Sequence, residues 1–316
     1  MKIIVLDGTP LNPGDLSWDA LHDLGDVTMH PRTAPDEVAQ RIKGAQIVLT
    51  NKVKLTAEHF ASAPDLKYVG EMATGFDNID VKSARENGVI VCNVPSYSAN
   101  FTAQTAIALL LELCHYVGSH AAAVAAGAWP DSPDFSFWNT PLVDLENKTL
   151  VILGVGTIGS RVAKIGAALG MQIIAAQSPG RSYDSDSMHL PLSDALPQAD
   201  VVSLHCPLKP ETRQMVNAEF LAQMKPSALL INTARGALID EVALAKALEQ
   251  GAIAGFAADV LSVEPPPADN PLLSAKNTII TPHIGWASIE ARQRCLQTSV
   301  DNLRAYLDGK PRNVVS

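Results

Sequence analysis

Three charged or titratable residues follow three apolar, strand-like runs in the C-terminal half of the chain. Arg235 follows "ALLINTA", Glu264 comes shortly after "AIAGFAADV", and His283 follows "NTIITP". Each residue alone has an ordinary explanation, as a surface charge, a turn acid or a turn histidine. Ligands of open α/β sheets bind beyond the carboxyl ends of the strands, so we expect these three side chains to converge at one edge.

An arginine, a glutamate and a histidine together suit the reduction of a carbonyl group. Arg235 can bind a carboxylate or polarise a carbonyl. Glu264 beside the imidazole would favour its charged form and fix its orientation. His283 could then give a proton to the developing alkoxide, and Pro282 and Gly285 can hold its turn in one shape. These arguments predict that Arg235, Glu264 and His283 are catalytic.

A glycine-rich motif in "TLVILGVGTIGSRVAK" lies between a predicted strand and a predicted helix. Gly154 allows a tight turn, Gly156 lets the backbone approach a pyrophosphate, and Gly159 lets the helix pack closely on the strand. The helix N-terminus would meet the phosphates. In this context the motif predicts a dinucleotide-binding loop, with Thr157 and Ile158 inside it, rather than a purely structural turn.

The next predicted strand, "MQIIAAQ", bears on the choice of cofactor. It ends at Gln177 and is followed by Ser178 and Arg181, and no carboxylate appears before Asp184. A carboxylate here would bind the ribose hydroxyls of NAD and repel a 2′-phosphate, whereas an amide, a hydroxyl and a guanidinium tolerate one. The sequence therefore predicts that NADP is tolerated beside NAD. Preference for NADP is the sharper hypothesis, and a merely solvated Arg181 is its alternative.

Strand-like and amphipathic runs alternate along most of the 316 residues, which predicts parallel sheets with crossover helices. The first hundred residues contain the strand candidates "KIIVLD", "QIVLTN", "LKYVGEMA" and "VIVCNVP". A long helical stretch from about 98 to 126 and a proline-rich loop precede a second α/β series. We expect a first domain of residues 1–98 and 289–316, and a dinucleotide-binding domain of residues 99–288 inserted within it.

Composition narrows the class of partner. The formal net charge of −9 leaves no basic stripe for nucleic acid. The most apolar run, residues 105–117, is too short for a membrane span and contains Glu112 and His115. The N-terminus lacks a signal-peptide pattern, so we expect a cytoplasmic protein. The four cysteines have no metal-ligand spacing, which predicts structural thiols and no metal site, at Cys92, Cys114, Cys206 and Cys295.

The whole chain resembles the D-isomer-specific 2-hydroxyacid dehydrogenases. The resemblance rests on "GVGTIG", "NTARGALID", "ADVLSVEPPP" and "TPHIGW", in that order and spacing. It is closest to the glycerate dehydrogenase (hydroxypyruvate reductase) branch, through "VLDGTPLNPGDLSW", "TNKVKLT" and "SPDFSFWNTPL". It implies two Rossmann-like parallel-sheet domains, the nucleotide-binding one inserted into a flavodoxin-like substrate domain. The implied reaction transfers a hydride between NAD(P)H and a small 2-oxo acid, hydroxypyruvate or glyoxylate, to give D-glycerate or glycolate.

The same resemblance implies further roles for individual residues. Asp259 would hold the nicotinamide amide, and the rest of the cofactor cleft would be lined by Thr102, Cys206, Pro207, Thr212, Thr233, Ala234 and Gly285. The backbone N–H groups of Thr74 and Gly75 would bind the substrate carboxylate, which suits an anion. Lys52 could assist there, or be an ordinary surface lysine. The family usually forms homodimers, in which Trp138 would enter the neighbouring active site or anchor the interface.

The sequence departs from the family pattern at two places, and two alternative functions remain open. The family often has tyrosine and aspartate where this chain has Ala176 and Gln177, and "AE" where it has Ala103 and Gln104. The first departure leaves the cofactor open. A nucleotide-sensing corepressor on the same scaffold is one alternative, which the absence of extra interaction tails disfavours. A formate dehydrogenase is the other, disfavoured because formate enzymes carry glutamine where this chain has Glu264.

Overall fold

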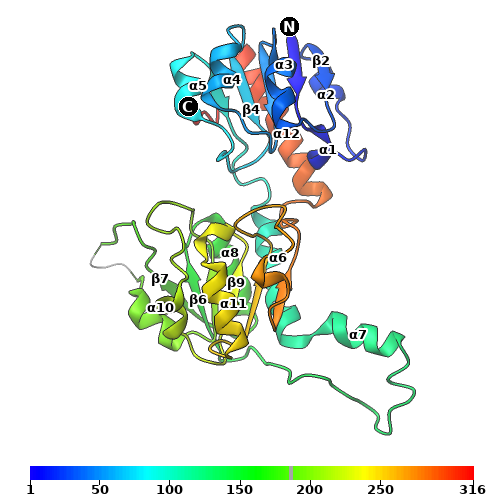
Figure 1. Cartoon of the computed structure of the whole chain (residues 1–316), viewed down its shortest axis with the longest axis vertical. Helices are drawn as coiled ribbons and strands as arrows, with labels where there is room; N and C mark the ends of the chain where they lie inside the picture. Colours follow the sequence, from blue (N-terminus) through cyan, green and yellow to red (C-terminus); the bar gives the residue numbers. More distant parts are fainter. Residues whose placement is uncertain (185–187) are drawn as a thin grey trace. The chain divides into compact units, whose positions relative to one another are not determined.

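The computed structural model describes residues 1–184 and 188–316 and divides into two compact units. Unit 1 comprises Met1–Ser98 and Trp286–Ser316, and unit 2 comprises Ala99–Gly285. Each unit is built on a parallel sheet flanked by helices (Figure 1). The chain thus crosses between the units twice, and its last segment completes the unit that its first segment began.

The sheet of unit 1 has five parallel strands in the order β2-β1-β3-β4-β5, which is the flavodoxin-like order. The strands are β1 (Lys2–Val5), β2 (Asp26–Met29), β3 (Ile47–Thr50), β4 (Tyr68–Glu71) and β5 (Ile90–Cys92). β3 and β4 are buried along their whole length, as apolar runs in a parallel sheet should be. β2 was absent from the strands expected from sequence, because it is an edge strand whose residues alternate between exposed and partly buried.

Helices cover both faces of this sheet. The short helices are α1 (Gly8–Leu11), α2 (Asp19–His22), η1 (Pro35–Glu37), α3 (Val38–Ile42), α4 (Ala57–Ser62) and α5 (Val81–Glu86). α3, α4 and α5 bury Ile42, Phe60 and Ala84 against one face. The long C-terminal helix α12 (Ile289–Leu307) buries Cys295 and Val300 against the other, so unit 1 needs both ends of the chain for its core.

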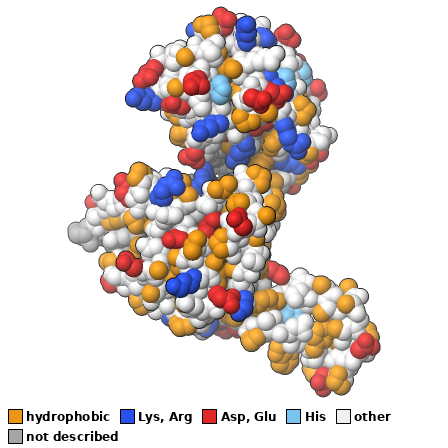
Figure 2. Space-filling model, in the orientation of Figure 1, with side chains coloured by type: hydrophobic (Ala, Val, Ile, Leu, Met, Phe, Trp, Pro, Cys, Tyr) orange, Lys and Arg blue, Asp and Glu red, His pale blue; other side chains and the backbone are white. Residues whose placement is uncertain are grey.

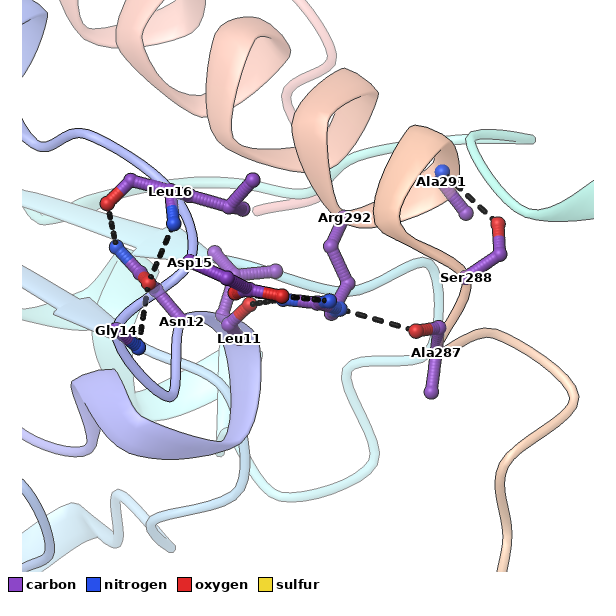
Figure 3. A network of polar contacts seen from close by, with 9 residues as sticks. All are labelled: Leu11, Asn12, Gly14, Asp15, Leu16, Ala287, Ser288, Ala291 and Arg292. Atoms are coloured by element: carbon purple, nitrogen blue, oxygen red, sulfur yellow. Dashed lines mark hydrogen bonds and ion pairs between the residues drawn. The ribbon is translucent and has the colours of Figure 1, made fainter.

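The start of α12 is tied to the loop after α1 by a buried guanidinium (Figure 3). Arg292 forms a two-pronged ion pair with Asp15, with N···O distances of 2.7 and 2.6 Å, and donates further to the carbonyls of Leu11 and Ala287. This contact holds the pKa of the Asp15 carboxyl below its usual range. Asn12 closes the same loop by accepting from the N–H groups of residues 14 and 16. The segment that re-enters unit 1 is therefore fixed where the helix begins.

The sheet of unit 2 has six parallel strands in the order β11-β10-β9-β8-β6-β7. They are β6 (Thr149–Leu153), β7 (Gln172–Ala176), β8 (Val201–Leu204), β9 (Leu229–Asn232), β10 (Gly255–Ala258) and β11 (Thr278–Ile280). The strand order reverses between β6 and β8. Ligands of doubly wound sheets bind in the crevice at such a switch point.

Two helical layers cover this second sheet, together with short 3₁₀ turns. One layer contains α6 (Ala99–His115) and α8 (Thr157–Ala168), and the other contains α9 (Leu192–Ala195), α10 (Ala218–Ala222) and α11 (Glu241–Glu249). The 3₁₀ turns are η2 (Leu196–Gln198), η3 (Gly236–Leu238) and η4 (Pro271–Leu273). The two apolar layers are separate clusters, one on each face of the sheet.

The long helical stretch expected from 98 to 126 is two helices. α6 ends at His115, Tyr116 adopts a left-handed φ of 50°, and α7 (Val117–Ala125) follows. α7 and the loop after it project from the body of unit 2 as an arm, residues 117–144 (Figure 1). Within the described residues no single helix is long and apolar enough to cross a membrane. By length and composition alone, the pair α6 and α7, bent by 58°, passes that test together.

Candidate active site

The strands that precede Arg235, Glu264 and His283 are neighbours in the sheet of unit 2. β9, β10 and β11 lie side by side, with Ala258 paired to Asn232 on one side and to Ile280 on the other. All three carboxyl ends therefore lie at the same edge, as expected. Gly236, next to Arg235, packs directly on the backbone that leads to Glu264, because a Cβ on it would lie 1.8 Å from the carbonyl carbon of Leu261.

His283 and Glu264 are in direct contact. The Nδ1 atom of His283 lies 2.6 Å from Oε2 of Glu264, and the other carboxylate oxygen accepts from the N–H of Leu261 at 3.0 Å. Both side chains keep contact with solvent, at 28% and 36% exposure. A carboxylate held in this way orients the imidazole and leaves Nε2 as the nitrogen that can exchange a proton with a ligand.

His283 has an uncommon backbone conformation. Its φ is 55°, in the left-handed region that few non-glycine residues adopt. Asp259, which is almost fully buried, fixes this turn by accepting from Thr281 Oγ1 at 2.6 Å, from the N–H of Ile284 at 2.8 Å and from the N–H of Gly285 at 2.6 Å. Strain of this kind persists only where surrounding contacts enforce it. Asp259 supplies these contacts.

Two further residues bind backbone groups next to the site residues, and the first of them was not predicted from the sequence. Asn232 is fully buried at the end of β9, accepts from the N–H of Ala234 and donates to the carbonyl of Arg235. The hydroxyl of Thr102, on α6, donates to the carbonyl of Gly285 at 2.8 Å. The half-buried Arg235 side chain donates from Nη1 to the carbonyl of Ala234. The sequence signal for Asn232 was its position as a polar residue directly after the apolar run "ALLI".

The glycine-rich loop has the geometry that a pyrophosphate requires. Gly154 has a φ of 95° and packs so closely on β8's end that a Cβ would lie 2.6 Å from the Cys206 nitrogen. A Cβ on Gly159 would lie 2.2 Å from the Gly154 oxygen, which brings the start of α8 onto β6. Nothing lies within 4 Å of the corresponding position at Gly156, so its backbone is open to a ligand. α8 begins at Thr157, with Ile158 in its first turn.

Other residues expected in the cofactor cleft lie at the same strand ends. Thr233, directly after β9, is buried, and its hydroxyl has no hydrogen-bond partner among the described residues. Such a hydroxyl suits a hydrogen bond to a bound cofactor. Cys206 is buried beside the loop, and burial raises the pKa of its thiol. The hydroxyl of Thr212 donates to the Pro207 carbonyl at 2.8 Å and closes the loop after β8. These features suit a dinucleotide across the switch point.

Residues 177–184, which follow β7, include an aromatic side chain that contacts two of the predicted cofactor residues. The phenol oxygen of Tyr183 accepts from the N–H of Ser178 at 2.8 Å, and the guanidinium of Arg181 lies 5.4 Å from the centre of the Tyr183 ring. Gln177 donates from its amide to the carbonyl of His189 at 3.2 Å. Arg181 and Ser178 thus contact the same aromatic side chain, directly after the strand where a ribose-binding carboxylate is often found.

The other predicted substrate residues lie elsewhere in the chain. Thr74 and Gly75 are in unit 1, after β4, where the Thr74 hydroxyl donates to the Val94 carbonyl at 2.8 Å. Lys52 follows β3 in the same unit, and its side chain is exposed. Trp138 lies on the arm and is 67% exposed. His283, Glu264, Asp259 and Gly285 are therefore brought together within unit 2, and Thr74, Gly75 and Lys52 belong to unit 1.

Comparison with known proteins shows the family of the chain. Residues 107–285 match the model of the D-isomer specific 2-hydroxyacid dehydrogenase, NAD binding domain. The chain is 46% identical over 321 residues to a hydroxypyruvate reductase of Blautia hydrogenotrophica, covering 100% of both chains. It is 38% identical over 316 residues to a glycerate dehydrogenase of Methylorubrum extorquens, covering 99% of this chain and 98% of that one.

A solved structure shares the whole architecture. It is an NADPH-dependent glyoxylate/hydroxypyruvate reductase of Sinorhizobium meliloti in complex with NADP and malonate. It superposes with a TM-score of 0.85 at 27% identity, covering 100% of this chain and 96% of that chain.

Proposed function

The chain belongs to the D-isomer-specific 2-hydroxyacid dehydrogenase family, and we propose that it interconverts hydroxypyruvate and D-glycerate, or glyoxylate and glycolate. It is an oxidoreductase that uses NAD(P). The observation that carries the choice of chemistry is the 2.6 Å contact between His283 and Glu264 at the carboxyl end of β11. A histidine oriented by a carboxylate beside a dinucleotide site is the arrangement needed to protonate an alkoxide.

Each residue of the site has a definite task in this reaction. A bound nicotinamide supplies or accepts the hydride. Glu264 holds Nδ1 of His283, so that Nε2 faces the substrate oxygen and delivers the proton in reduction, or removes it in oxidation. Arg235 binds the carboxylate and polarises the adjacent carbonyl. Asp259 and Thr102 keep the His283 turn in place, which lowers the cost of orienting the acid.

Substrate and cofactor are tested in one screen. We expect NADPH oxidation with hydroxypyruvate and glyoxylate to exceed that with pyruvate and bulkier 2-oxo acids, and NADPH to have a lower KM than NADH. The physical reason for the cofactor preference is Arg181, which can pair with a 2′-phosphate where no carboxylate opposes it. Equal rates with bulky 2-oxo acids would argue against the proposed substrates, and a strong preference for NADH would argue against the proposed cofactor.

Arg181→Ala is the matched variant for that screen. It should raise the KM for NADPH by roughly 10- to 100-fold, about the value of a charge-assisted hydrogen bond, and leave the KM for NADH nearly unchanged. Lys164→Ala, exposed on α8, is the control for loss of a positive charge. Equal effects of Arg181→Ala on both cofactors would contradict a 2′-phosphate contact.

We also propose that the protein is a homodimer assembled through the arm. The arm exposes large apolar side chains on a segment that projects from unit 2 (Figure 2), including Val117, Val124, Trp129, Phe135, Trp138, Leu142 and Val143. Exposed apolar surface of this extent typically marks a protein interface. Trp138 would then either reach the neighbouring active site or anchor the interface.

The arm predicts the effect of one double substitution. Val124→Glu combined with Leu142→Asp should convert a dimer into monomers in sedimentation velocity, because two charges would be buried at the interface. Val242→Glu, on α11, is the control, since Val242 is 70% exposed but lies outside the arm. A wild-type protein that sediments as a monomer would contradict the dimer, and a dimeric double variant would contradict the arm as its interface.

We propose a cytoplasmic location on chemical grounds. All four cysteines are buried free thiols, whereas proteins of oxidising compartments commonly carry disulfides. Burial raises the pKa of the Cys114 thiol to about 11, which keeps it in the inert protonated form. Labelling of fractionated cells with an antibody to the protein would test the location directly.

A further inference from the structure

A buried acid ends β4, a fully buried strand of unit 1, and the proposed reaction does not use it. Glu71 is the last residue of β4 and only 1% exposed. One of its carboxyl oxygens, Oε1, is buried and has no hydrogen-bond partner among the described residues. A carboxylate in such a position is costly unless a cation pairs with it or a proton neutralises it.

The other oxygen of Glu71 joins two loops. Oε2 accepts from Asn78 Nδ2 at 3.1 Å, and the same amide donates to the Val53 carbonyl at 3.1 Å. The backbone of Asn78 accepts from the N–H of Leu55 at 2.9 Å. Asn78 ends the loop that begins with Thr74 and Gly75, and Val53 follows Lys52. Glu71 therefore anchors an amide that fixes the Thr74–Gly75 loop against the Lys52 loop.

A second buried acid supports the Lys52 loop. Both oxygens of Asp7 accept backbone N–H groups, from Asn51 at 2.8 Å and from Lys52 at 2.7 Å, and Oδ1 also accepts from the Thr50 hydroxyl. Asp7 thus has donors on both oxygens, whereas Glu71 has one donor on one oxygen. Burial raises the pKa of both acids, but the hydrogen bonds to both oxygens of Asp7 oppose that rise. Glu71, with a single donor, is the acid whose environment favours the neutral form more strongly.

We propose that Glu71 is a positioning residue that works in its protonated form: it braces the two loops proposed to bind the substrate carboxylate, and its ionisation as pH rises weakens that binding. This inference rests on the proposed function, because it deepens the roles of Lys52, Thr74 and Gly75. Glu71 itself does not touch the substrate; it acts through Asn78 and through the charge that it adds or withholds.

The electrostatic environment of Glu71 agrees with a neutral acid. The titratable groups that face it are Asp7 from the end of β1, Lys52 and Asp77 from the two loops, and Cys295 from α12. Burial is the main cause that raises the pKa of Glu71 well above its ordinary value, and the charge of Asp7 adds to it. When Glu71 does ionise, a new negative charge lies behind loops that must attract an anion, so the KM for the substrate should rise.

The test compares Glu71→Gln and Glu71→Leu with the wild type, using NADPH and hydroxypyruvate from neutral to alkaline pH. Gln keeps the acceptor for Asn78 but cannot ionise, so its KM should match the wild type at the low end of this pH range and rise less than the wild type as pH increases. Leu removes the acceptor and should raise KM roughly tenfold at every pH with little change in kcat, the loss of about 1.4 kcal/mol of binding. Glu58→Gln, on the exposed face of α4, is the control.

Two further measurements keep this inference separate from the proposed reaction. Calorimetric titration of the NADP-loaded protein with oxamate, an unreactive 2-oxo acid mimic, should show the same pattern of affinities without turnover. Since the folded protein binds the Glu71 proton more tightly than the unfolded chain, Glu71 destabilises the fold as pH rises above its unfolded pKa. The Tm of Glu71→Gln relative to that of the wild type should therefore increase as pH rises.

Each part of the inference is contradicted by a different result. A Gln variant whose KM and oxamate affinity follow the wild-type pH dependence would overturn the ionisation step. A folded Leu variant with the wild-type KM would overturn the bracing role, and if Leu fails to fold, the Gln variant still decides the matter. Lack of turnover with every 2-oxo acid, together with the expected oxamate pattern, would refute the proposed substrates and leave the role of Glu71 standing.

Discussion

His283→Asn is expected to lower kcat by roughly 10²–10⁴, the usual contribution of a general acid. Asparagine is the best replacement because it tolerates the left-handed φ of 55° that this position requires, and its amide can still contact Glu264. The turn held by Asp259 should therefore survive, and only the proton donor is lost. Steady-state kinetics with hydroxypyruvate would measure kcat, and fluorescence titration would measure NADPH affinity, which should remain within about twofold.

His115→Asn, at the exposed end of α6, provides the matched control and should keep wild-type turnover. If His283→Asn also keeps it, the imidazole is not the acid and the proposed mechanism fails. Loss of cofactor binding together with kcat would instead indicate that His283 supports the fold of the turn more than the proton transfer.

Gly236→Ala is expected to have the largest effect on stability of any single methyl addition near the site. The new Cβ would lie 1.8 Å from the carbonyl carbon of Leu261 and 2.2 Å from its oxygen, and backbone atoms cannot move aside as a flexible side chain can. We expect a loss of about 3 kcal/mol or more, which corresponds to a fall in Tm of about 6–12 °C for a domain of this size. Because Arg235 and Glu264 flank this contact, kcat/KM should fall as well.

Gly251→Ala is the control, because it replaces a glycine without creating a backbone clash. Gly251 has a φ of 67° but nothing within 4 Å of its Cβ position, so alanine there should cost only about 1 kcal/mol. Differential scanning calorimetry of both variants measures the contrast. Equal Tm values for the two would mean that the contact at Gly236 relaxes easily and does not fix Arg235 beside Glu264.

Buried strands were predictable from sequence, and the marginal elements were not. β3, β4 and β8 are buried at every residue and mostly apolar, which is the pattern of strands covered on both faces. β2 alternates Asp26 and Thr28 with half-buried residues and is only four residues long, so its hydrophobic signal is weak. The break at Tyr116 was equally hidden, because the apolar character of the sequence continues from α6 into α7.

The candidate site shows the same division. The strands that precede Arg235, Glu264 and His283 could be expected to end at one edge because carboxyl ends of parallel strands meet there, and the contact between Glu264 and His283 agrees with this. The contacts that hold the His283 turn could not, since they depend on which carboxylate reaches which N–H group. Asp259 is the clearest case: the family resemblance suggested a cofactor contact, and in the structure its carboxylate accepts from Thr281, Ile284 and Gly285.

The discontinuous build of unit 1 imposes an order on biosynthesis. Its first 98 residues leave the ribosome well before α12 has been translated, and until then the apolar side chains that receive Cys295 and Val300 have no partner. Unit 2 is one uninterrupted stretch of the chain, so it can fold before α12 is available to complete unit 1. The ion pair between Arg292 and Asp15 can form only after the start of α12 has been translated, and a chaperone that shields the early segment would have its main effect before that moment.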